Sequence, residues 1–158
     1  MKISHAVLPI LLAMSALTAQ AQTKPLVAGD ALPQLSLKDQ HDKPASLPAN
    51  LKQVIFAADN GGAGLVTGWL DAQPKDWLQQ NQRVYLADIH KMPGLITRMF
   101  ALPKLREKAY PIILGREEAD LAAFPRKKDC VTLLPVNEGK VGEAAYVCDA
   151  QALASSFK

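Results

Sequence analysis

Apolar residues along the chain alternate between two spacings, one typical of strands and one typical of helices. Residues 53–58 form a compact apolar run that predicts a strand buried on both faces of a sheet. Residues 65–70 then place apolar side chains at helical spacing, and Pro74 is expected to end or kink that helix. A further apolar run predicts the next strand at residues 83–89.

The second half of the chain repeats this strand-and-helix order. Pro93 suits the first turn of another helix, which Pro103 should bend. That helix is expected to have an apolar face made of Leu95, Ile96, Met99, Phe100 and Leu102. A short strand is predicted at residues 110–114, followed by a short helix over residues 116–124 with Leu121 and Phe124 facing inward.

Both ends of the domain are predicted to be strand-rich. Leu35 and Leu37 alternate with polar residues as in a half-buried strand, and residues 45–47 can return beside it. Near the other end, residues 130–136 and 144–148 predict a hairpin around the turn at 137–140, before a last helix capped by Asp149. Alternating strands and helices with a terminal hairpin predict an α/β fold with a mixed central sheet.

The first residues of the 158-residue chain resemble an export signal. A short polar start precedes an apolar run over residues 6–17, and Ala19 and Ala21 supply the small residues of a cleavage site. We expect a signal peptide at 1–21, a tether at 22–28, and one domain at 29–158 in the periplasm or outside the cell. The alternative is an uncut anchor, although the run is shorter than the roughly 20 residues that span a bilayer.

Two cysteines, Cys130 and Cys148, remain in the expected mature chain. An even count in an oxidising compartment favours a disulfide. If the hairpin pairs Val136 with Gly142, the two cysteines lie directly opposite each other, whereas a shift by one residue separates them. Two buried free thiols and a redox-active pair remain as alternatives. Cys148 is expected deep in an apolar strand, which argues against an exposed redox bond.

Three stretches of the sequence resemble the thioredoxin-like superfamily, in particular its secreted peroxiredoxin-like and cytochrome-maturation-type redoxins. The opening Gly29-Asp30-x-x-Pro33-x-Leu35 is similar to the N-terminal hairpin of these proteins. The stretch at 110–114 and the residues at 132–141 are similar to a later strand and to the closing hairpin. The resemblance covers residues 29–157 and implies a three-layer sandwich around a mixed sheet, extended by an N-terminal β-hairpin.

The catalytic residues of that superfamily are absent. Its chemistry needs a cysteine at the helix N-terminus after the first core strand, where backbone amides favour the thiolate. Here residues 57–64 contain no cysteine, serine or threonine, and no proline stands at 129–131, where the facing cis-proline is expected. The sequence therefore predicts a binding or accessory protein without thiol catalysis at this position. The alternative is an oxidoreductase that uses Cys130 and Cys148 at a relocated site.

Two loops are candidates for ligand binding. The first is a glycine-rich loop expected to precede a helix, and amides there can hold an anion. Its candidate residues are Asn60, Gly61, Gly62 and Gly64. The second is the basic loop that begins with Arg126 and Lys127. Each has a simpler interpretation, as a permissive turn and as a solvated loop, and a nucleotide or flavin in the glycine loop is a further alternative.

Charge and histidine placement narrow the possible partners. The net charge of +3 is spread along the chain, which argues against a nucleic-acid partner. His41 and His90 lack a third ligand nearby in the sequence, so we expect neither a metal nor any other cofactor. Trp69 and Trp77 are expected to pack in the core. The expected partner is another periplasmic protein or a small anionic ligand, without membrane insertion once the signal is cleaved.

Overall fold

The structure is a computed structural model that describes residues 24–158. The predicted signal peptide at 1–21 lies outside the described residues. Among the described residues, no helix has the length and apolar character needed to cross a membrane. Part of the expected tether is described, and there the backbone N–H of Leu26 donates to the carbonyl oxygen of Ala123 at 2.8 Å.

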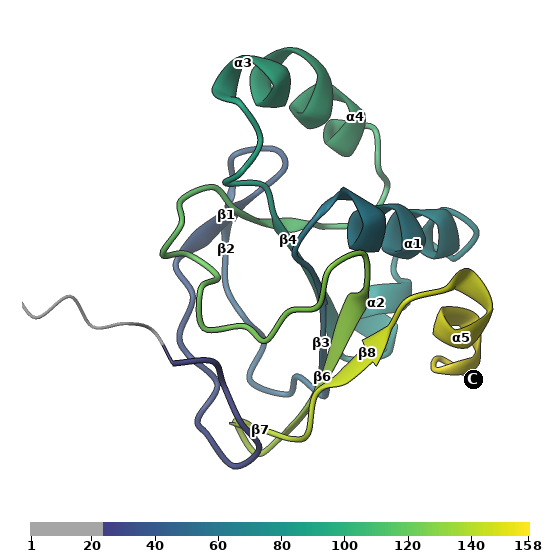
Figure 1. The fold of residues 1–158 in the computed structure, drawn as a ribbon. Coiled ribbons are helices and arrows are strands. Elements are labelled where there is room, and N and C mark those ends of the chain that lie inside the picture. Colours follow the sequence, from purple (N-terminus) through teal and green to yellow (C-terminus); the bar gives the residue numbers. More distant parts are fainter. Residues whose placement is uncertain (1–23) are drawn as a thin grey trace, which may run out of the picture.

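A mixed sheet forms the centre of the molecule, with the strand order β2-β1-β5-β4-β3-β6-β7 and with β8 also paired to β6 (Figure 1). Neighbours β3, β4 and β5 are parallel, whereas β6 runs antiparallel to β3. The strands are β1 (Leu37–Asp39), β2 (Pro44–Ala45), β3 (Gln53–Ala57), β4 (Arg83–Asp88), β5 (Ile113–Gly115), β6 (Val131–Asn137), β7 (Lys140–Val141) and β8 (Ala145–Val147). The predicted central strands are thus confirmed.

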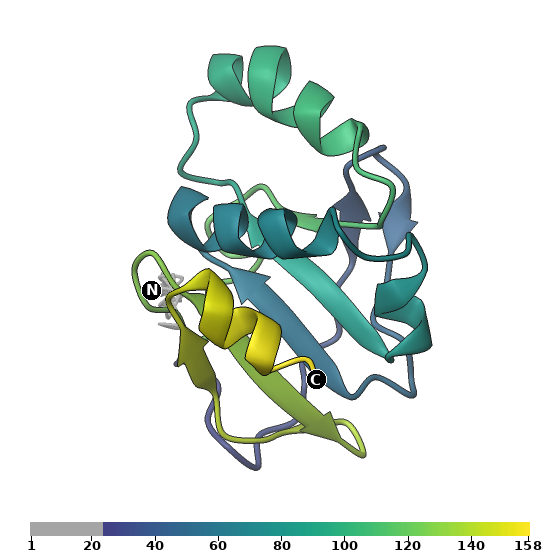
Figure 2. The ribbon, with the colours of Figure 1, turned by 90° about the vertical axis from the view of Figure 1, so that its right-hand side faces the viewer.

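One face of the sheet is covered by helices. These are α1 (Asn60–Leu70), α2 (Trp77–Gln80), α5 (Ala150–Ser155), and a continuous helical segment formed by α3 (Gly94–Ile96), the π-helical turn η1 (Thr97–Ala101) and α4 (Leu102–Arg106). In Figure 2 this last segment, α1 and α5 lie one below another, with α1 in the middle. Trp69 and Trp77 pack edge to face, with ring centroids 4.5 Å apart, and both contact Phe157. Their predicted packing role is confirmed.

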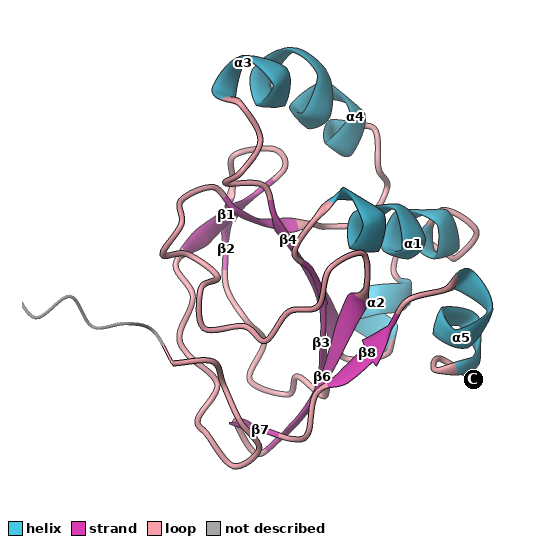
Figure 3. Ribbon diagram, in the orientation of Figure 1, coloured by secondary structure: helices cyan, strands magenta, loops and turns pink. Residues whose placement is uncertain are grey.

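Irregular chain covers the opposite face of the sheet (Figure 3). Leu121 and Phe124 are buried there, and the Phe124 ring lies 5.5 Å from that of Phe56, as their inward orientation predicted. The predicted short helix over 116–124 is wrong, because these residues form turns. The Asp120 carboxylate accepts the backbone N–H groups of Arg116 and Glu117 at 2.8 and 2.9 Å, and so satisfies donors that a helix would leave unpaired. The layers on both faces give the predicted thioredoxin-like sandwich.

The continuous helical segment Gly94–Arg106, hereafter the arm, departs from its predicted orientation. Only Leu102 of its expected apolar face is buried, whereas Leu95, Ile96, Met99 and Phe100 are exposed. The π turn ends at Ala101, two residues before Pro103, and the N–H of Leu102 donates to the carbonyl of Thr97, five residues back. Proline lacks an N–H and clashes with the carbonyl four residues before it, so a wider turn relieves that contact and rotates the preceding side chains.

The closing hairpin contains an extra residue on its return strand. Val136 pairs with Val141, so the pairing of Val136 with Gly142, one of the registers that the sequence allows, does not form at the turn. Farther along, Leu133 pairs with Ala145 and Val131 with Val147, which is the register expected at the cysteines. Three residues of the return strand therefore oppose two of β6, as in a bulge, and Gly142 N–H donates to Pro135 O at 2.8 Å.

Candidate functional site

The candidate site lies at the N-terminus of α1, directly after the central strand β3. Asp59 is the N-cap of this helix, with an extended backbone, and its Oδ1 accepts the N–H of Gly62 at 2.9 Å. Aspartate is a favoured N-cap because its side chain satisfies an amide that the first turn leaves unpaired. Residues 60–64 are the first five residues of α1 itself, so the prediction of a glycine loop before the helix is wrong.

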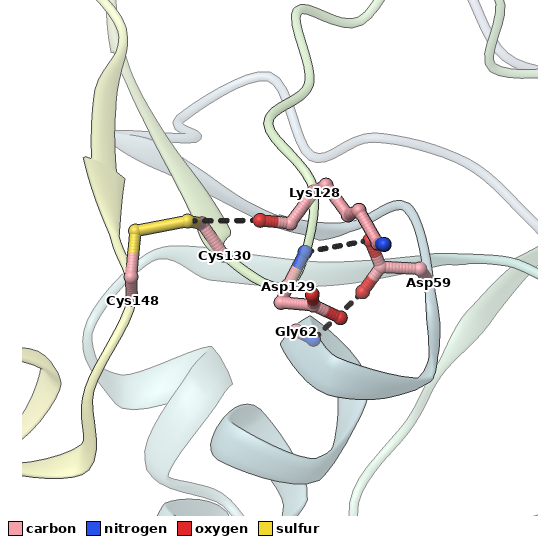
Figure 4. Close-up of a disulfide and its surroundings, with 6 residues drawn as sticks. All are labelled: Asp59, Gly62, Lys128, Asp129, Cys130 and Cys148. Carbon is pink, nitrogen blue, oxygen red and sulfur yellow. Dashed lines mark hydrogen bonds between the residues drawn. A yellow bond between two sulfur atoms is a disulfide. The ribbon is translucent and has the colours of Figure 1, made fainter.

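A second segment closes over this helix end from the start of β6. The backbone N–H of Asp129 donates to Oδ2 of Asp59 at 2.9 Å, so one carboxylate binds amides from both segments (Figure 4). Asp129 has a φ of 57°, in the left-handed region, and no peptide bond between residues 24 and 158 is cis. The turn that faces the helix is thus built without a cis-proline.

Gly61 and Gly62 allow this close approach. A Cβ on Gly61 would lie 2.5 Å from Oδ1 of Asp129, and one on Gly62 would lie 2.6 Å from the carbonyl oxygen of Cys130. Gly64, by contrast, has nothing within 4 Å of such an atom. The first two glycines therefore accommodate the protein's own backbone, and their small size is explained without a bound phosphate.

The carboxyl group of Asp59 is held in its ionised form. Burial opposes ionisation, but hydrogen bonds from the amides of Gly62, Asp129 and Gly61, with the positive charge of Lys128, outweigh it and lower the pKa of Asp59. Hydrogen bonds to the charged form favour that form. A carboxylate thus occupies the helix end where the resemblance implies an activated thiol.

A disulfide between Cys130 and Cys148 lies beside this helix end, which confirms the predicted pairing. Figure 4 shows it next to Lys128 and Asp129, and the two bonded residues stand just outside the paired ends of β6 and β8. Cys130 is 4 % exposed and its sulfur lies 3.2 Å from the carbonyl oxygen of Lys128. Cys148 is exposed, so its predicted burial in a strand is wrong; it follows the last residue of β8.

The basic loop does not present both of its candidate cations to the glycines. Arg126 donates to Oδ2 of Asp88 at 2.9 Å and to the carbonyl oxygen of Leu121 at 2.7 Å. The ring of His90 lies within hydrogen-bond distance of the other oxygen of Asp88, which ties this histidine to its neighbour at the end of β4. Lys127 is exposed and makes no ion pair within residues 24–158.

Sequence analysis missed a cavity that opens beside the candidate site. A space of about 710 Å³ lies between α1, the sheet and the arm, and a neighbouring one of about 440 Å³ continues along the arm. Both are lined by Asp59, Asn60, Asp88, Met92, Ala101 and Lys104. No sequence signal could reveal them, because they depend on how far the arm stands from α1. Nowhere in residues 24–158 do three or more His, Cys, Asp or Glu side chains gather as metal ligands do.

Comparison with solved structures shows the fold. The chain is similar to a protein assigned as thiol:disulfide interchange protein DsbE from Chlorobium tepidum, with 14 % identity, a TM-score of 0.57, and coverage of 82 % of this chain and 94 % of that one. It is also similar to peroxidoxin BcpB from Mycobacterium tuberculosis (15 % identity, TM-score 0.54, coverage 84 % and 94 %). A third similar structure is the thioredoxin domain of a thiol-disulfide oxidoreductase from Bacteroides vulgatus (14 % identity, TM-score 0.52, coverage 84 % of this chain and 98 % of that one).

Neither a scan against protein-family models nor a search of curated proteins gave a match. The likeness to solved structures therefore shows a thioredoxin-like fold. Its α1 N-terminus, the position at which the resemblance implies a catalytic cysteine, carries Asp59, Asn60 and two glycines.

Proposed function

We propose that this protein is an exported thioredoxin-fold protein that works by binding a partner, without thiol chemistry at α1. One observation carries the proposal. The helix end where a nucleophile would stand is filled by the Asp59 carboxylate, which accepts the N–H groups of Gly62 and Asp129 at 2.9 Å each. A reacting sulfur and its substrate would need the same amides and the same space.

Two features support export to an oxidising compartment. Residues 1–21 resemble a cleavable signal peptide, and both cysteines of the described chain are joined in a disulfide. Stable disulfides are typical of proteins outside the cytoplasm. The two features are independent of each other, since one lies in the leader and the other in the folded domain.

The partner is another periplasmic protein or a small anionic ligand. Asn60 and Lys127 are exposed near the helix end and remain free to meet it, together with the rim of the adjoining cavity. Gly61 and Gly62 serve the close packing of the site. Their amides already bind Asp59, so they are not available to the partner. Of the two candidate cations in the basic loop, Lys127 is the one available to an anion, since Arg126 is paired with Asp88.

Assays of turnover test this proposal. The purified protein is incubated with insulin and dithiothreitol, and separately with hydrogen peroxide and dithiothreitol. We expect the rates to equal those of the reductant alone. An acceleration that persists over many turnovers and disappears in the Cys130→Ala/Cys148→Ala variant would overturn the binding proposal.

A second candidate function is thiol–disulfide exchange through Cys130 and Cys148, and the exposure of Cys148 favours it. A thiolate of a partner dithiol would attack Sγ of Cys148, forming a mixed disulfide and releasing Cys130 as a thiolate. The partner's second thiol would then break the mixed disulfide, leaving the partner oxidised and both cysteines reduced. Exchange requires access to one sulfur, and Cys148 is the exposed residue of the pair.

Equilibration with glutathione buffers of graded redox potential separates the two functions. A redox-active pair is half-reduced within the range that glutathione covers, whereas a structural disulfide stays oxidised throughout. Alkylation of the released thiols followed by mass spectrometry measures the reduced fraction. We expect the disulfide to stay oxidised, and reduction within the glutathione range would favour the second candidate.

A further inference from the structure

The cavity between α1, the sheet and the arm is bounded by small residues from three elements. Ala57 and Ala87 are register partners on β3 and β4, and they line the cavity on the side of the sheet. Gly64 lines it from α1 and Ala101 lines it from the arm. A Cβ on Gly64 would meet no atom within 4 Å. These positions carry no bulky side chain, so the space between the elements stays unfilled.

The size and lining of this cavity are those of a small-molecule site. Its two adjoining spaces measure about 710 and 440 Å³. Ligand pockets usually measure roughly 300–1,000 Å³ and are lined mainly by apolar side chains. Leu70 and Ile89 line the larger space, whereas Ile96 and Phe100 of the arm line the smaller one. A ligand here would cover apolar surface of the arm that the fold itself leaves exposed.

A buried polar group beside the larger space has no partner. Tyr85 lines this space and is 1 % exposed, but its hydroxyl has no hydrogen-bond partner within residues 24–158. Tyr110 lines the same space, and its hydroxyl is satisfied because it donates to Oδ1 of Asp71 at 2.9 Å. Leaving a buried hydroxyl unpaired costs free energy, which a hydrogen bond to a ligand would recover.

The hydroxyl of Tyr85 is a hydrogen-bond donor over the whole physiological pH range. Burial raises the pKa of Tyr85, because the charged phenolate is the form that burial disfavours. Burial and the hydrogen bond to Asp71 likewise raise the pKa of Tyr110. The ligand atom that complements Tyr85 is therefore an oxygen that accepts a hydrogen bond, such as the oxygen of a carbonyl group.

The charged residues around the cavity carry both signs. Lys91 and Lys104 line the smaller space together with Asp59 and Asp88. Both carboxylates are already engaged, since Asp59 accepts backbone amides and Asp88 accepts Arg126. With cations and carboxylates around one opening, neither sign dominates. The charges therefore do not select an ionic ligand.

We propose that this cavity binds an uncharged small molecule with a ring-sized apolar body and an oxygen that accepts a hydrogen bond. The Tyr85 hydroxyl would donate to that oxygen. The apolar body would lie over Ala57 and Ala87 and extend toward Ile96 and Phe100. This inference goes beyond the proposed function, because the ligand occupies the interior of the cavity and carries no charge.

Two probes of the same shape test the proposal. They are acetophenone, which has a carbonyl oxygen, and isopropenylbenzene, in which a methylene group replaces that oxygen. Each is titrated into nitrogen-15-labelled protein purified from the periplasm, and NMR follows the backbone amides. We expect both probes to give saturable shifts at Ala57, Ala87 and Ala101. Benzoate and benzylammonium, which are charged at neutral pH, should bind more weakly than acetophenone.

Tyr85→Phe removes the hydroxyl and leaves the ring in place. It should lower the affinity for acetophenone roughly fivefold and leave that for isopropenylbenzene unchanged. The variant should fold as the wild type does, because this hydroxyl bonds to no other group within the described residues. Tyr146→Phe is the matched control, since Tyr146 is exposed and lies outside the cavity. It should bind both probes as the wild type does.

Variants that fill the cavity test its position. Ala101→Trp from the arm and Gly64→Leu from α1 should each abolish saturable binding of both probes, so the test stands if one of them does not fold. Ala152→Trp on α5 is the control, because Ala152 is exposed and lies outside the cavity. It should change neither affinity. The amide spectrum of each variant shows whether it is folded.

Four results would overturn the proposal. The first is the absence of saturable shifts with either probe, and the second is a set of shifts away from the cavity that the filling variants do not remove. The third is an equal effect of Tyr85→Phe on both probes, which would mean that the hydroxyl meets water only. The fourth is tighter binding of benzoate or benzylammonium than of acetophenone, which would assign the cavity to a charged ligand.

Discussion

At the scale of single residues, the site depends on small size at two positions and on one carboxylate. Gly61 and Gly62 let the Asp129 turn approach the helix, and Asp59 joins the two segments by accepting one amide from each. The absence of a thiol was predictable from the sequence. The contact that replaces it was not, because it joins residues 70 positions apart.

Gly62→Ala and Gly64→Ala should change stability in opposite directions. The new methyl at position 62 would meet the Cys130 carbonyl oxygen at 2.6 Å, so we expect the free energy of unfolding to fall by about 1–3 kcal/mol. Position 64 lies in a helix and has open space around it, so alanine there should raise the free energy of unfolding by about 0.5–1 kcal/mol. Urea unfolding measures both. A loss of similar size at both positions would contradict the packing argument.

Asp59→Asn should remove a pH-dependent part of the stability. The pKa of Asp59 is lowered in the folded protein, so its carboxylate stabilises the fold above the ordinary pKa of 3.8. That contribution is lost as the pH falls through the folded pKa. Because asparagine can still cap the helix, we expect the variant to be less stable by about 0.5–1 kcal/mol at neutral pH. Near pH 3 the difference in the free energy of unfolding between the wild type and the variant should be smaller. Urea unfolding at both pH values measures this difference. A difference that does not depend on pH would count against the argument.

At the scale of elements, the periodicity of apolar residues correctly predicted the strands and the helix whose surroundings are the same along their length. The strands at 53–57 and 83–88 and the helix at 60–70 follow their hydrophobic patterns closely. The buried side of the arm was not predicted correctly. Its apolar residues could form either of two faces, and the π turn before Pro103 decides which of them is buried. The exposure of Cys148 was missed because the strand ends one residue before it.

Removal of the disulfide should destabilise the closing strands. The bond joins residues 18 positions apart, and a loop of about that length stabilises a fold by roughly 3 kcal/mol, mainly by restricting the unfolded chain. We expect Cys130→Ala/Cys148→Ala to lower the free energy of unfolding by about 2–4 kcal/mol. Reduced wild type should behave like the double variant. Unchanged stability in both would show that the bond has no structural role.

At the scale of the whole molecule, the fold class followed from the order of elements and the resemblance, whereas the distribution of layers did not. The helices of residues 24–158 gather on one face of the sheet, and irregular chain covers the other. The cavity beside Asp59 results from the distance between the arm and α1. Such spacing is set by packing over the whole domain and leaves no local mark in the sequence.

Export predicts a defined mature form. Mass spectrometry of the protein from a periplasmic extract should show an N-terminus at Gln22 and a mass two hydrogen atoms below that of the reduced chain. A protein that retains residues 1–21 in the membrane fraction would contradict cleavage. A protein with two free thiols in that extract would contradict the disulfide.

The central claim is that an ionised carboxylate, held by backbone amides, occupies the helix end at which the resemblance implies a reactive sulfur. Carbon-13 NMR of the side-chain carboxyl of Asp59 across an acid titration measures this directly. The account predicts a titration midpoint below the ordinary aspartate pKa of 3.8. A midpoint at or above that value would mean that the amides do not hold the carboxylate, and would contradict the account.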